Sequence, residues 1–303
     1  MLSSLVLASS LFAAQVKVCT YNIRTADFDD KDPAPWSLRS GCVAEAIKAT
    51  GADLVALQEV IARQRETLDR DLGEAYESAG VCRDDGKLKG ESTPIFWRKD
   101  RFDELASGTF WLSETPEVAG SRGWDGMFPR VCTWAMLKDR ETGKTVAFFN
   151  AHLDHRGAQA KVNGAKLIAA RAAEARRNGA ALVVITGDLN TVETEPPYET
   201  VSASFADSVR LCVTPEGPFR TSHGWRVRTD EEEVSCRAGF ARPAAERATR
   251  AFHDLIGGHR IDHIFVNEGV KVMSHRTWNG TVRIGEKSIY PSDHFPVSAT
   301  LAY

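Results

Sequence analysis

Residues 182–190 read LVVITGDLN, an apolar run that ends abruptly in glycine, aspartate, leucine and asparagine. The run predicts a buried strand, and Gly187 permits a sharp exit from it. Asp188 and Asn190 lie two positions apart, so in an extended chain their side chains point the same way. A carboxylate and an amide placed like this are able to orient a water molecule and a phosphate oxygen. The alternative is an ordinary turn, since Gly, Asp and Asn all favour turns.

The same pattern, a short apolar run beside a polar residue, recurs along the chain. The runs are 16–21 before Asn22, 54–58 before Glu59, 94–97 after Glu91, 146–151 before His152, 261–266 with Asp262, and 292–301 with Asp293 and His294. Runs of this length, rich in β-branched and aromatic residues, predict strands.

Helical patterns separate several of these runs. One helix is predicted at 38–50, capped by Ser37 and stopped by Gly51. Others are predicted at 158–177 and 61–72. Strands that alternate with helices around a hairpin-rich middle predict an α/β fold, a four-layer sandwich of two packed mixed β-sheets flanked by helices. We expect one domain over residues 16–303, with the poorly periodic segment 207–260 as an insertion at the rim of the site.

The composition is that of an ordinary globular protein, with 43% hydrophobic residues and a net charge of −3. The sequence has no basic tail, so its charge does not indicate tight, sequence-independent binding of duplex nucleic acid. No stretch is long enough to span a membrane. Residues 1–15 are predicted to be a signal peptide, because 2–14 are apolar or small, which indicates a secreted or periplasmic protein. A buried first strand is the alternative, and we expect a monomer.

The chain has six cysteines, which an oxidising compartment allows but does not require. Cys19 and Cys132 lie inside strand-like runs and are predicted to be buried free thiols. Cys212 and Cys236 flank a polar segment and are the best candidates for a disulfide. Without a CxxC pair, the sequence does not indicate a zinc site.

The strand-end acids and histidines have the chemistry of a metal-assisted hydrolase. Glu59 follows a buried run, where a carboxylate must be solvated, paired or bound to a metal. Mg²⁺ prefers such a site because it takes one or two carboxylates and keeps water and substrate oxygens. Asp262 is a candidate partner for the imidazole of His294, and Glu91 for that of His152. Such pairing fixes the tautomer and raises the histidine pKa.

Seven motifs appear in one order: TYNIR, LQEV, PIFWR, NAHLDH, GDLN, RIDHIFV and SDHFPV. Because it has these seven motifs in this order, the chain resembles the endonuclease/exonuclease/phosphatase superfamily over residues 16–301. The stretch FWLSETPE, at 110–117, looks like a branch of small secreted bacterial members and its deadenylase-like relatives. Leu189 departs from the phenylalanine that is commoner in GDLN. His152 stands where the apurinic-endonuclease branch has tyrosine, which argues against that branch.

The resemblance implies a role for each residue of the motifs. Glu59 would be the main metal ligand, with Asn22 helping it and Asp293 near the metal. Asp188 would orient or deprotonate the attacking water, and Asn190 would hold the phosphate. His294, supported by Asp262, and His152, supported by Glu91, would lie on either side of the phosphate. Arg130 is a weaker phosphate-binding candidate.

Together the residues and the resemblance predict a divalent-metal-dependent phosphoester hydrolase that uses Mg²⁺, for which Mn²⁺ is able to substitute. Our first expectation for the substrate is a nucleic acid or another phosphodiester, as for an endo- or exonuclease. The alternative is a phosphomonoesterase acting on an inositol phosphate, a lipid headgroup or a sugar phosphate. A catalytically dead binding module is the least favoured, because the acids, amides and histidines of the motifs are all present.

Overall fold

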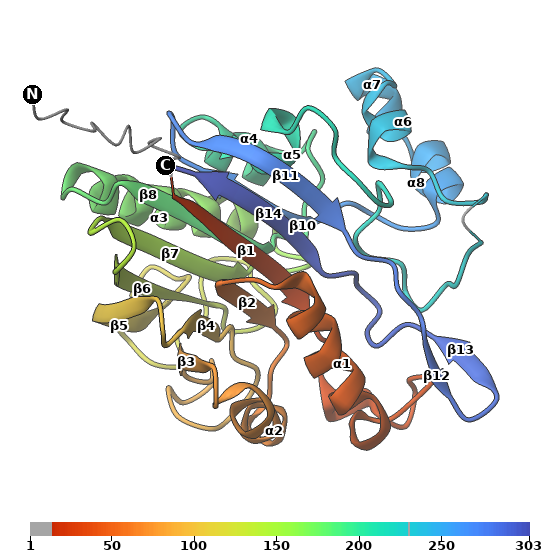
Figure 1. Cartoon of the computed structure of the whole chain (residues 1–303), viewed down its shortest axis with the longest axis horizontal. Coiled ribbons are helices and arrows are strands. Elements are labelled where there is room, and N and C mark those ends of the chain that lie inside the picture. The colour runs from red at the N-terminus through yellow and green to blue at the C-terminus, as the bar shows by residue number, and fades with distance from the viewer. Residues whose placement is uncertain (1–13, 230) are drawn as a thin grey trace, which may run out of the picture.

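The computed structural model describes residues 14–229 and 231–303, and in them two six-stranded sheets pack face to face (Figure 1). The first sheet has the order β11-β14-β1-β2-β4-β3 and the second β5-β6-β7-β8-β10-β9. Both sheets are mixed, because β1 and β2 pair in parallel, as do β7 and β8, while the other pairs are antiparallel. This architecture confirms the predicted α/β sandwich.

The bounds of the strands follow the apolar runs of the sequence closely. The first sheet contains β1 (Gln15–Asn22), β2 (Leu54–Gln58), β3 (Tyr76–Ala79), β4 (Ile95–Arg98), β11 (Lys271–Thr277) and β14 (Val297–Ala302). The second contains β5 (Phe102–Trp111), β6 (Val131–Asp139), β7 (Thr145–His152), β8 (Leu182–Asp188), β9 (Ala206–Asp207) and β10 (Asp262–Val266). A separate hairpin consists of β12 (Val282–Ile284) and β13 (Lys287–Ile289).

Helices cover the two outer faces and complete the four layers. They are α1 (Trp36–Thr50), α2 (Ala62–Leu72), α3 (Ala158–Arg177), α4 (Pro196–Ser202), α5 (Ser208–Leu211), α6 (Cys236–Phe240), α7 (Ala244–Arg247) and α8 (Arg250–Ile256), with a 3₁₀ turn at Ala26–Phe28. Helices α1 and α2 pack on the first sheet, and α3 and α4 on the second.

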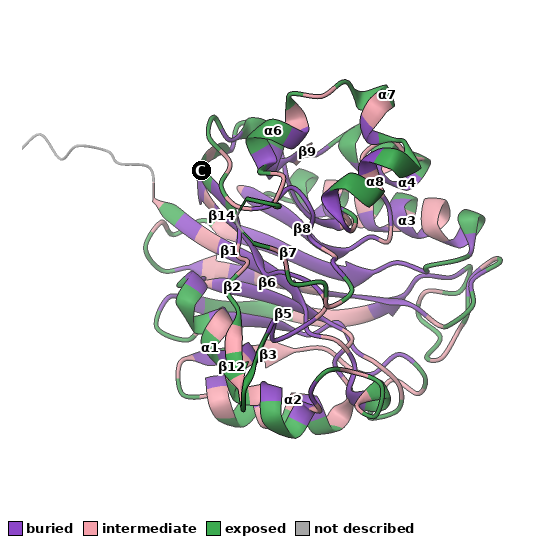
Figure 2. Ribbon diagram, turned by 90° about the vertical axis from the view of Figure 1, so that its right-hand side faces the viewer, coloured by how far each residue is buried: buried purple, intermediate pink, exposed green. Residues whose placement is uncertain are grey.

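Successive side chains of a strand point to opposite faces of its sheet, so each strand serves two cores. In β1, Val16 and Val18 belong to the cluster between the sheets, whereas Cys19 and Tyr21 pack beneath α1. The central strands are accordingly buried along most of their length, while the helices expose their outer faces (Figure 2). Burial on both faces explains why these strands read as nearly continuous apolar runs.

Helix α1 begins at Trp36 rather than at residue 38, so the predicted cap at Ser37 is wrong. Pro35 occupies the cap position, and the Asp29 carboxylate accepts a hydrogen bond from the Trp36 amide at 2.8 Å. A side chain seven residues earlier therefore satisfies the first free amide of the helix, which begins one residue before Ser37. The helix ends as predicted, with Gly51 in the left-handed conformation at a φ of 62°.

The last strand is also shorter than predicted, because β14 begins at Val297 and residues 292–296 form a loop. The amide of Phe295 donates to the Thr221 carbonyl at 2.7 Å, and the Asp293 carbonyl accepts from the His223 amide at 2.9 Å. These backbone groups bond to the segment 207–260 instead of to a neighbouring strand. That loop carries Asp293 and His294.

The candidate disulfide between Cys212 and Cys236 is not formed, since all six cysteines are free thiols. Cys212 follows α5, whereas Cys236 begins α6 and its sulfur lies 3.1 Å from the Pro218 carbonyl oxygen. Burial raises the pKa of the Cys236 thiol to about 11. Cys19 and Cys132 are buried, as predicted.

Most of the predicted signal peptide, residues 1–13, lies outside the described residues. The described chain starts just before β1, whose first residue, Gln15, pairs with Ala302 of β14. Between residue 14 and the C-terminus, the described helices include none that is long and apolar enough to cross a membrane.

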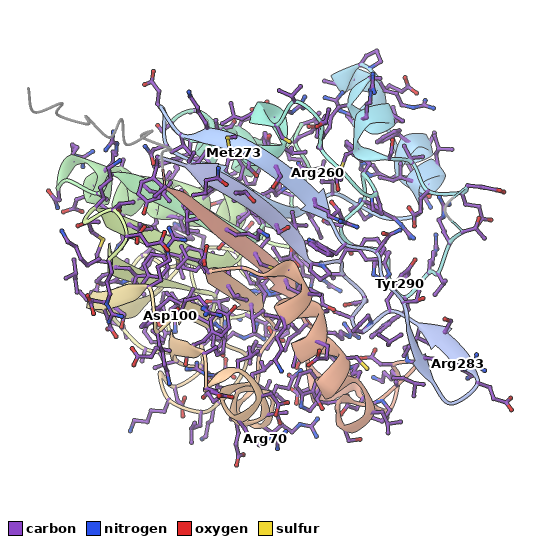
Figure 3. The ribbon with its side chains drawn as sticks, viewed as in Figure 1. Arg70, Asp100, Arg260, Met273, Arg283 and Tyr290 are labelled. Atoms are coloured by element: carbon purple, nitrogen blue, oxygen red, sulfur yellow. The ribbon has the colours of Figure 1, made fainter. Side chains whose placement is uncertain are left out.

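The segment 207–260 contains α5 to α8, of which α6 to α8 form a group beside the sheets (Figure 1). Phe219, Phe252 and Ile256 make a small core of their own there. A buried network anchors the segment to β10: Asp207 accepts hydrogen bonds from Arg260 at 2.8 Å and from His263 at 3.2 Å. Arg260, labelled in Figure 3, is 4% exposed.

We predict that Asp207→Asn lowers the free energy of unfolding at pH 7 by about 3 kcal/mol, because it leaves the Arg260 guanidinium buried without a carboxylate. Burial raises the pKa of Asp207, but Arg260 and His263 outweigh it and hold that pKa well below its usual range. The stabilisation is therefore present above about pH 4, the unfolded value, and is lost as the pH falls below it.

Urea unfolding at pH 7 and at about pH 3 tests this expectation. The gap between wild type and Asp207→Asn should narrow at the lower pH. The matched control is Asp103→Asn, which removes an exposed partner of Arg140 and should change stability by less than about 0.5 kcal/mol. Equal effects of the two substitutions would contradict the assignment.

Candidate active site

The predicted site residues share one face of the strands. In β1, β7, β8 and β10, the positions that face the other sheet are apolar over much of the strand and turn polar at one end. The polar members are Asn22, His152, Asp188 and Asp262, which continue the alternation of Val18, Phe148, Val184 and Ile264. Strand register gathers them, because Asp188 lies opposite both His152 and Asp262. The site is the polar end of the layer between the sheets.

Hydrogen bonds cross between the sheets at this end. The Asn22 amide nitrogen donates to Asp188 Oδ2 at 3.0 Å and to Glu59 Oε1 at 3.0 Å. Deeper in the layer, Gln58 Nε2 donates to Asn150 Oδ1 at 2.7 Å. Asn150 was not among the site residues predicted from the sequence. Its signal was available, since a polar residue stands at a sheet-facing position of an otherwise apolar strand.

The backbone is strained where the strands end. Glu59 has a φ of 62° and Asn190 a φ of 46°, values that residues other than glycine adopt at an energetic cost. Gly187 is required, because a Cβ there would lie 1.9 Å from the Ala151 carbonyl oxygen. Strain at Glu59 and Asn190, two polar residues beyond strand ends, indicates that the surrounding fold holds these side chains in place.

Glu59 is held as a carboxylate. Its second oxygen accepts the Thr25 amide at 2.9 Å, in addition to the bond from Asn22. Burial raises the pKa of Glu59, but these hydrogen bonds and the positive charges of His294 and Arg24 outweigh it and leave the pKa below its ordinary value. A partly buried anion of this kind is a suitable metal ligand.

Asp188 lies at the centre of the site. Besides Asn22, its Oδ1 accepts the Asn190 amide at 2.9 Å, and its Oδ2 lies 3.6 Å from His152 Nε2 and 3.8 Å from His294 Nε2. Burial, followed by the negative charge of Asp262, raises the pKa of Asp188 to about 7. A carboxylate with this pKa is suited to accept a proton near neutral pH.

The predicted pairing of Asp262 with His294 is confirmed in its geometry. His294 Nδ1 donates to Asp262 Oδ2 at 2.8 Å. Burial lowers the pKa of His294, but the carboxylate of Asp262, with smaller contributions from Asp188 and Asp293, raises it well above the ordinary value. Thr221 supports the pair, because its hydroxyl oxygen accepts the Asp262 amide at 3.1 Å. The ring is therefore an imidazolium that presents Nε2 to the site.

The predicted pairing of Glu91 with His152 is wrong. Glu91 accepts a hydrogen bond from Arg83 at 2.6 Å, and Nδ1 of His152 has no hydrogen-bond partner in the described chain. Nε2 of His152 instead meets the Asn190 amide nitrogen at 2.9 Å. Burial and then the positive charges of Arg130 and Arg83 hold the pKa of His152 well below its ordinary value. Arg83 had no signal in the sequence motifs.

Asp293 and Arg130 complete the predicted set. Asp293 Oδ2 lies 3.7 Å from Arg24 Nη1, and burial raises the pKa of this carboxyl group. Arg130 is 6% exposed and donates to His155 Nδ1 at 3.2 Å, beside His152 but not against the Asp188 carboxylate. The predicted residues therefore surround one point, with Asp188 near the middle and Arg130 behind His152.

Two groups of the described site residues have atoms that are able to coordinate a metal ion. Asp188, Asp262 and His294 have possible ligand atoms within 4.8 Å of one another. We disfavour this group, because a metal ligand must be a neutral imidazole and Asp262 keeps His294 protonated. Glu59 and Asn22 fit better, because Glu59 stays ionised. The neighbouring carboxyl group of Asp293 has a raised pKa, which the charge of a bound cation would lower.

Comparisons with other proteins give one family. The model of the Endonuclease/Exonuclease/phosphatase family matches residues 19–294. A family protein of known structure from Bacteroides thetaiotaomicron is 31% identical, with a TM-score of 0.81, over 96% of this chain and 98% of that one. A mannosyl-6-phosphatase from the same species is 32% identical, with a TM-score of 0.81, over 95% of this chain and 100% of that one. No curated protein sequence matches.

A more distant structure shares the fold alone. The TDP2 protein of D. rerio, solved with a single-strand DNA product, is 16% identical, with a TM-score of 0.66, over 96% of this chain and 100% of that one. At this identity the likeness concerns the arrangement of strands and helices and carries no argument about substrate.

We predict that Asp262→Asn moves the pKa of His294 from above to below its ordinary value of about 6.5, because burial then acts without the adjacent negative charge. The measurement is a proton NMR titration of the imidazole Cε1 resonances in metal-free protein. Asp100→Asn, at an exposed position, is the control and should leave the titration unchanged. An unchanged His294 pKa in Asp262→Asn would mean that Asp188 or Asp293 holds the proton instead.

Proposed function

The chain belongs to the Endonuclease/Exonuclease/phosphatase family and is a phosphoester hydrolase, and we propose that it hydrolyses its substrate by direct in-line attack of water with a divalent metal ion. The observation that carries this proposal is the convergence on Asp188. One carboxylate oxygen, Oδ2, lies 3.0 Å from Asn22, 3.6 Å from His152 and 3.8 Å from His294. Three groups therefore surround the same small space: the Asp188 carboxylate, which is able to accept a proton, the neutral imidazole of His152 and the imidazolium of His294.

In this mechanism Asp188 orients the attacking water and accepts its proton, for which a pKa of about 7 is well placed. The side-chain nitrogen of Asn190 donates to His152 Nε2 and to the Leu153 carbonyl, and it holds a phosphate oxygen by turning the second of these N–H groups to the substrate. The bond from its own backbone to Asp188 keeps the two residues in register. Fixing water and phosphate in line gives a proximity effect that requires no covalent intermediate.

The two histidines act differently on the phosphate. His294 is charged, so its Nε2 stabilises the negative charge that grows on the phosphate and is able to donate a proton to the leaving oxygen. His152 is neutral, with Nε2 accepting a hydrogen bond from Asn190 and thereby fixing the amide that holds the phosphate. Asp262 keeps the first ring charged, and burial, helped by Arg130 and Arg83, keeps the second neutral.

Members of this family typically depend on a divalent metal, and we propose Mg²⁺, held by Glu59 with help from Asn22 and Asp293. The ion supplies positive charge to the phosphate oxygens and to the attacking water when it is bound. The residues fit such an ion because four carboxylates lie near one another here: Asp188 and Asp262, which are buried, and Glu59 and Asp293, which are partly buried.

For the substrate we propose a small phosphorylated molecule, with a sugar phosphate as the first to try. The sequence led us to expect a phosphodiesterase or nuclease, which we keep as the second candidate. The chain has 38 Lys and Arg against 41 Asp and Glu, so it offers no excess of positive charge to a long polyanion. The 32% identical relative that covers nearly the whole chain is a mannosyl-6-phosphatase, which supports the smaller substrate.

We predict that Glu59→Gln preserves the fold and lowers kcat/KM by about a hundredfold or more, because it removes the anionic oxygen that attracts the metal. Steady-state kinetics with Mg²⁺ and calorimetric titration of Mg²⁺ measure the two effects together. Glu77→Gln, on the exposed face of β3, is the matched control and should leave both unchanged. Full turnover of wild type in excess EDTA would contradict the metal proposal.

We predict a shallow dependence of KM on salt. One or two phosphate contacts would raise KM by no more than about fifteenfold between about 50 and 200 mM salt, whereas a protein that grips many phosphates loses about a thousandfold or more. The measurement compares a sugar phosphate with a long DNA duplex under the same conditions. A steep loss of affinity for the duplex, with efficient cleavage at low salt, would restore the nuclease reading.

A further inference from the structure

Two arginines lie behind His152 and are nearly buried. Arg83, in the loop between β3 and β4, is 9% exposed, and Arg130, just before β6, is 6% exposed. They lie on either side of Glu91, whose Oε2 is 2.6 Å from Arg83 Nη1 and 4.0 Å from Arg130 Nη1. Cys132 of β6 lies opposite Ala151 of β7, so Arg130, two residues before Cys132, lies beside the end of β7 that carries His152. The pair therefore adjoins the phosphate position proposed above, and both guanidinium charges act on the His152 ring.

Several N–H groups of this pair are not used by the protein. Nε of Arg83, and both Nε and Nη1 of Arg130, have no hydrogen-bond partner in the described part of the chain. Asp154 lies 3.8 Å from Arg130 Nε, but its oxygens accept backbone amides such as those of Met127 and Gly157. Buried guanidinium donors without partners are costly, so the fold keeps them for a reason other than its own stability.

Carboxylates hold the pair from several sides. Besides Glu91 and Asp154, Asp84 lies near the pair, with its Oδ1 at 3.7 Å from Arg83 Nε. The contacts of Asp84 and Asp154 are longer than hydrogen bonds. The two guanidinium groups are therefore anchored by charge, while three of their nitrogen atoms keep N–H groups for an oxygen ligand.

We propose that Arg83 and Arg130 form a subsite for the second negative charge of a phosphomonoester, so that the enzyme prefers monoesters to diesters. This inference rests on the proposed function and adds the class of substrate to it. A monoester carries up to two negative charges and three terminal oxygens, whereas a diester carries one charge and two such oxygens. Guanidinium groups match these oxygens in charge and geometry.

The surroundings fix Arg83 for this role. Its guanidinium carbon lies 5.0 Å from the centre of the Phe128 ring, and that ring also stacks with His155 at 6.1 Å. His155 in turn accepts the one hydrogen bond that Arg130 makes to it, at 3.2 Å. The two arginines are therefore linked through one aromatic stack, which holds both forks before any ligand arrives. Preorganisation of this kind favours binding.

The test compares p-nitrophenyl phosphate, a monoester, with bis(p-nitrophenyl) phosphate, a diester, at about pH 7.5 with Mg²⁺. For wild type we expect the larger kcat/KM with the monoester. Arg83→Gln should lower the ratio of the two kcat/KM values by about tenfold to a hundredfold, the range for hydrogen bonds to charged groups. Arg83→Lys, which retains the charge but not the fork, should fall between the two. Arg70→Gln, at an exposed surface position of α2 (Figure 3), is the control.

Binding of inorganic phosphate to metal-free protein provides a second readout that does not need turnover. Calorimetry of the wild-type protein should show an affinity for phosphate that increases as the pH rises through about 6, where a phosphoryl group loses its second proton. Arg83→Gln should lose that increase while keeping the wild-type melting temperature. An unchanged monoester-to-diester ratio in folded Arg83→Gln would overturn the inference and leave the proposed function standing. If wild type hydrolyses neither ester, the proposed function fails, and the phosphate titration alone decides whether the subsite exists.

Discussion

The hydrogen bonds that Asn22 makes across the two sheets are the constraint on which the site depends. Asn22 ends a strand of the first sheet and Asp188 ends a strand of the second, and 3.0 Å separates their side chains. This distance exists only because the apolar layer below brings the sheets together in one register, with Gln58 and Asn150 making a second crossing bond at 2.7 Å. The geometry of the site is thus a consequence of the packing of the sandwich.

Much of this was predictable, because the alternation of side chains along a strand is visible in the sequence. Asp188, Asp262 and Asn22 stand at positions where an apolar residue would continue the pattern, and each lies between the sheets. The pairing of Asp262 with His294 followed from two motifs that belong to adjacent late segments. A polar residue at a buried position needs a partner, so the pattern predicts where partners must meet.

The remaining features depend on loops, whose paths the alternation does not determine. Glu91 was expected to face His152, but Arg83, eight residues earlier in the same loop, donates a hydrogen bond to its carboxylate at 2.6 Å. Likewise Asp29 caps α1 from a turn, where Ser37 was the local candidate. In both places a charged group seven or eight residues away along the chain makes the contact that another residue was expected to make. Such competition is decided by tertiary contacts, which a single sequence does not display.

The two histidines show how this competition produces function. Both are buried beside the same carboxylate, His152 at the end of β7 and His294 in the loop before β14. Asp262 outweighs burial and drives the pKa of His294 up, whereas burial, followed by the charges of Arg130 and Arg83, holds the pKa of His152 down. Opposite shifts in one small space leave one ring charged and the other neutral. Asp262 on one side and the two arginines on the other therefore distinguish the rings, and of these three residues only Arg83 had no signal in the sequence motifs. Because His152 is neutral, the positive charge on its side of the site belongs to the guanidinium groups.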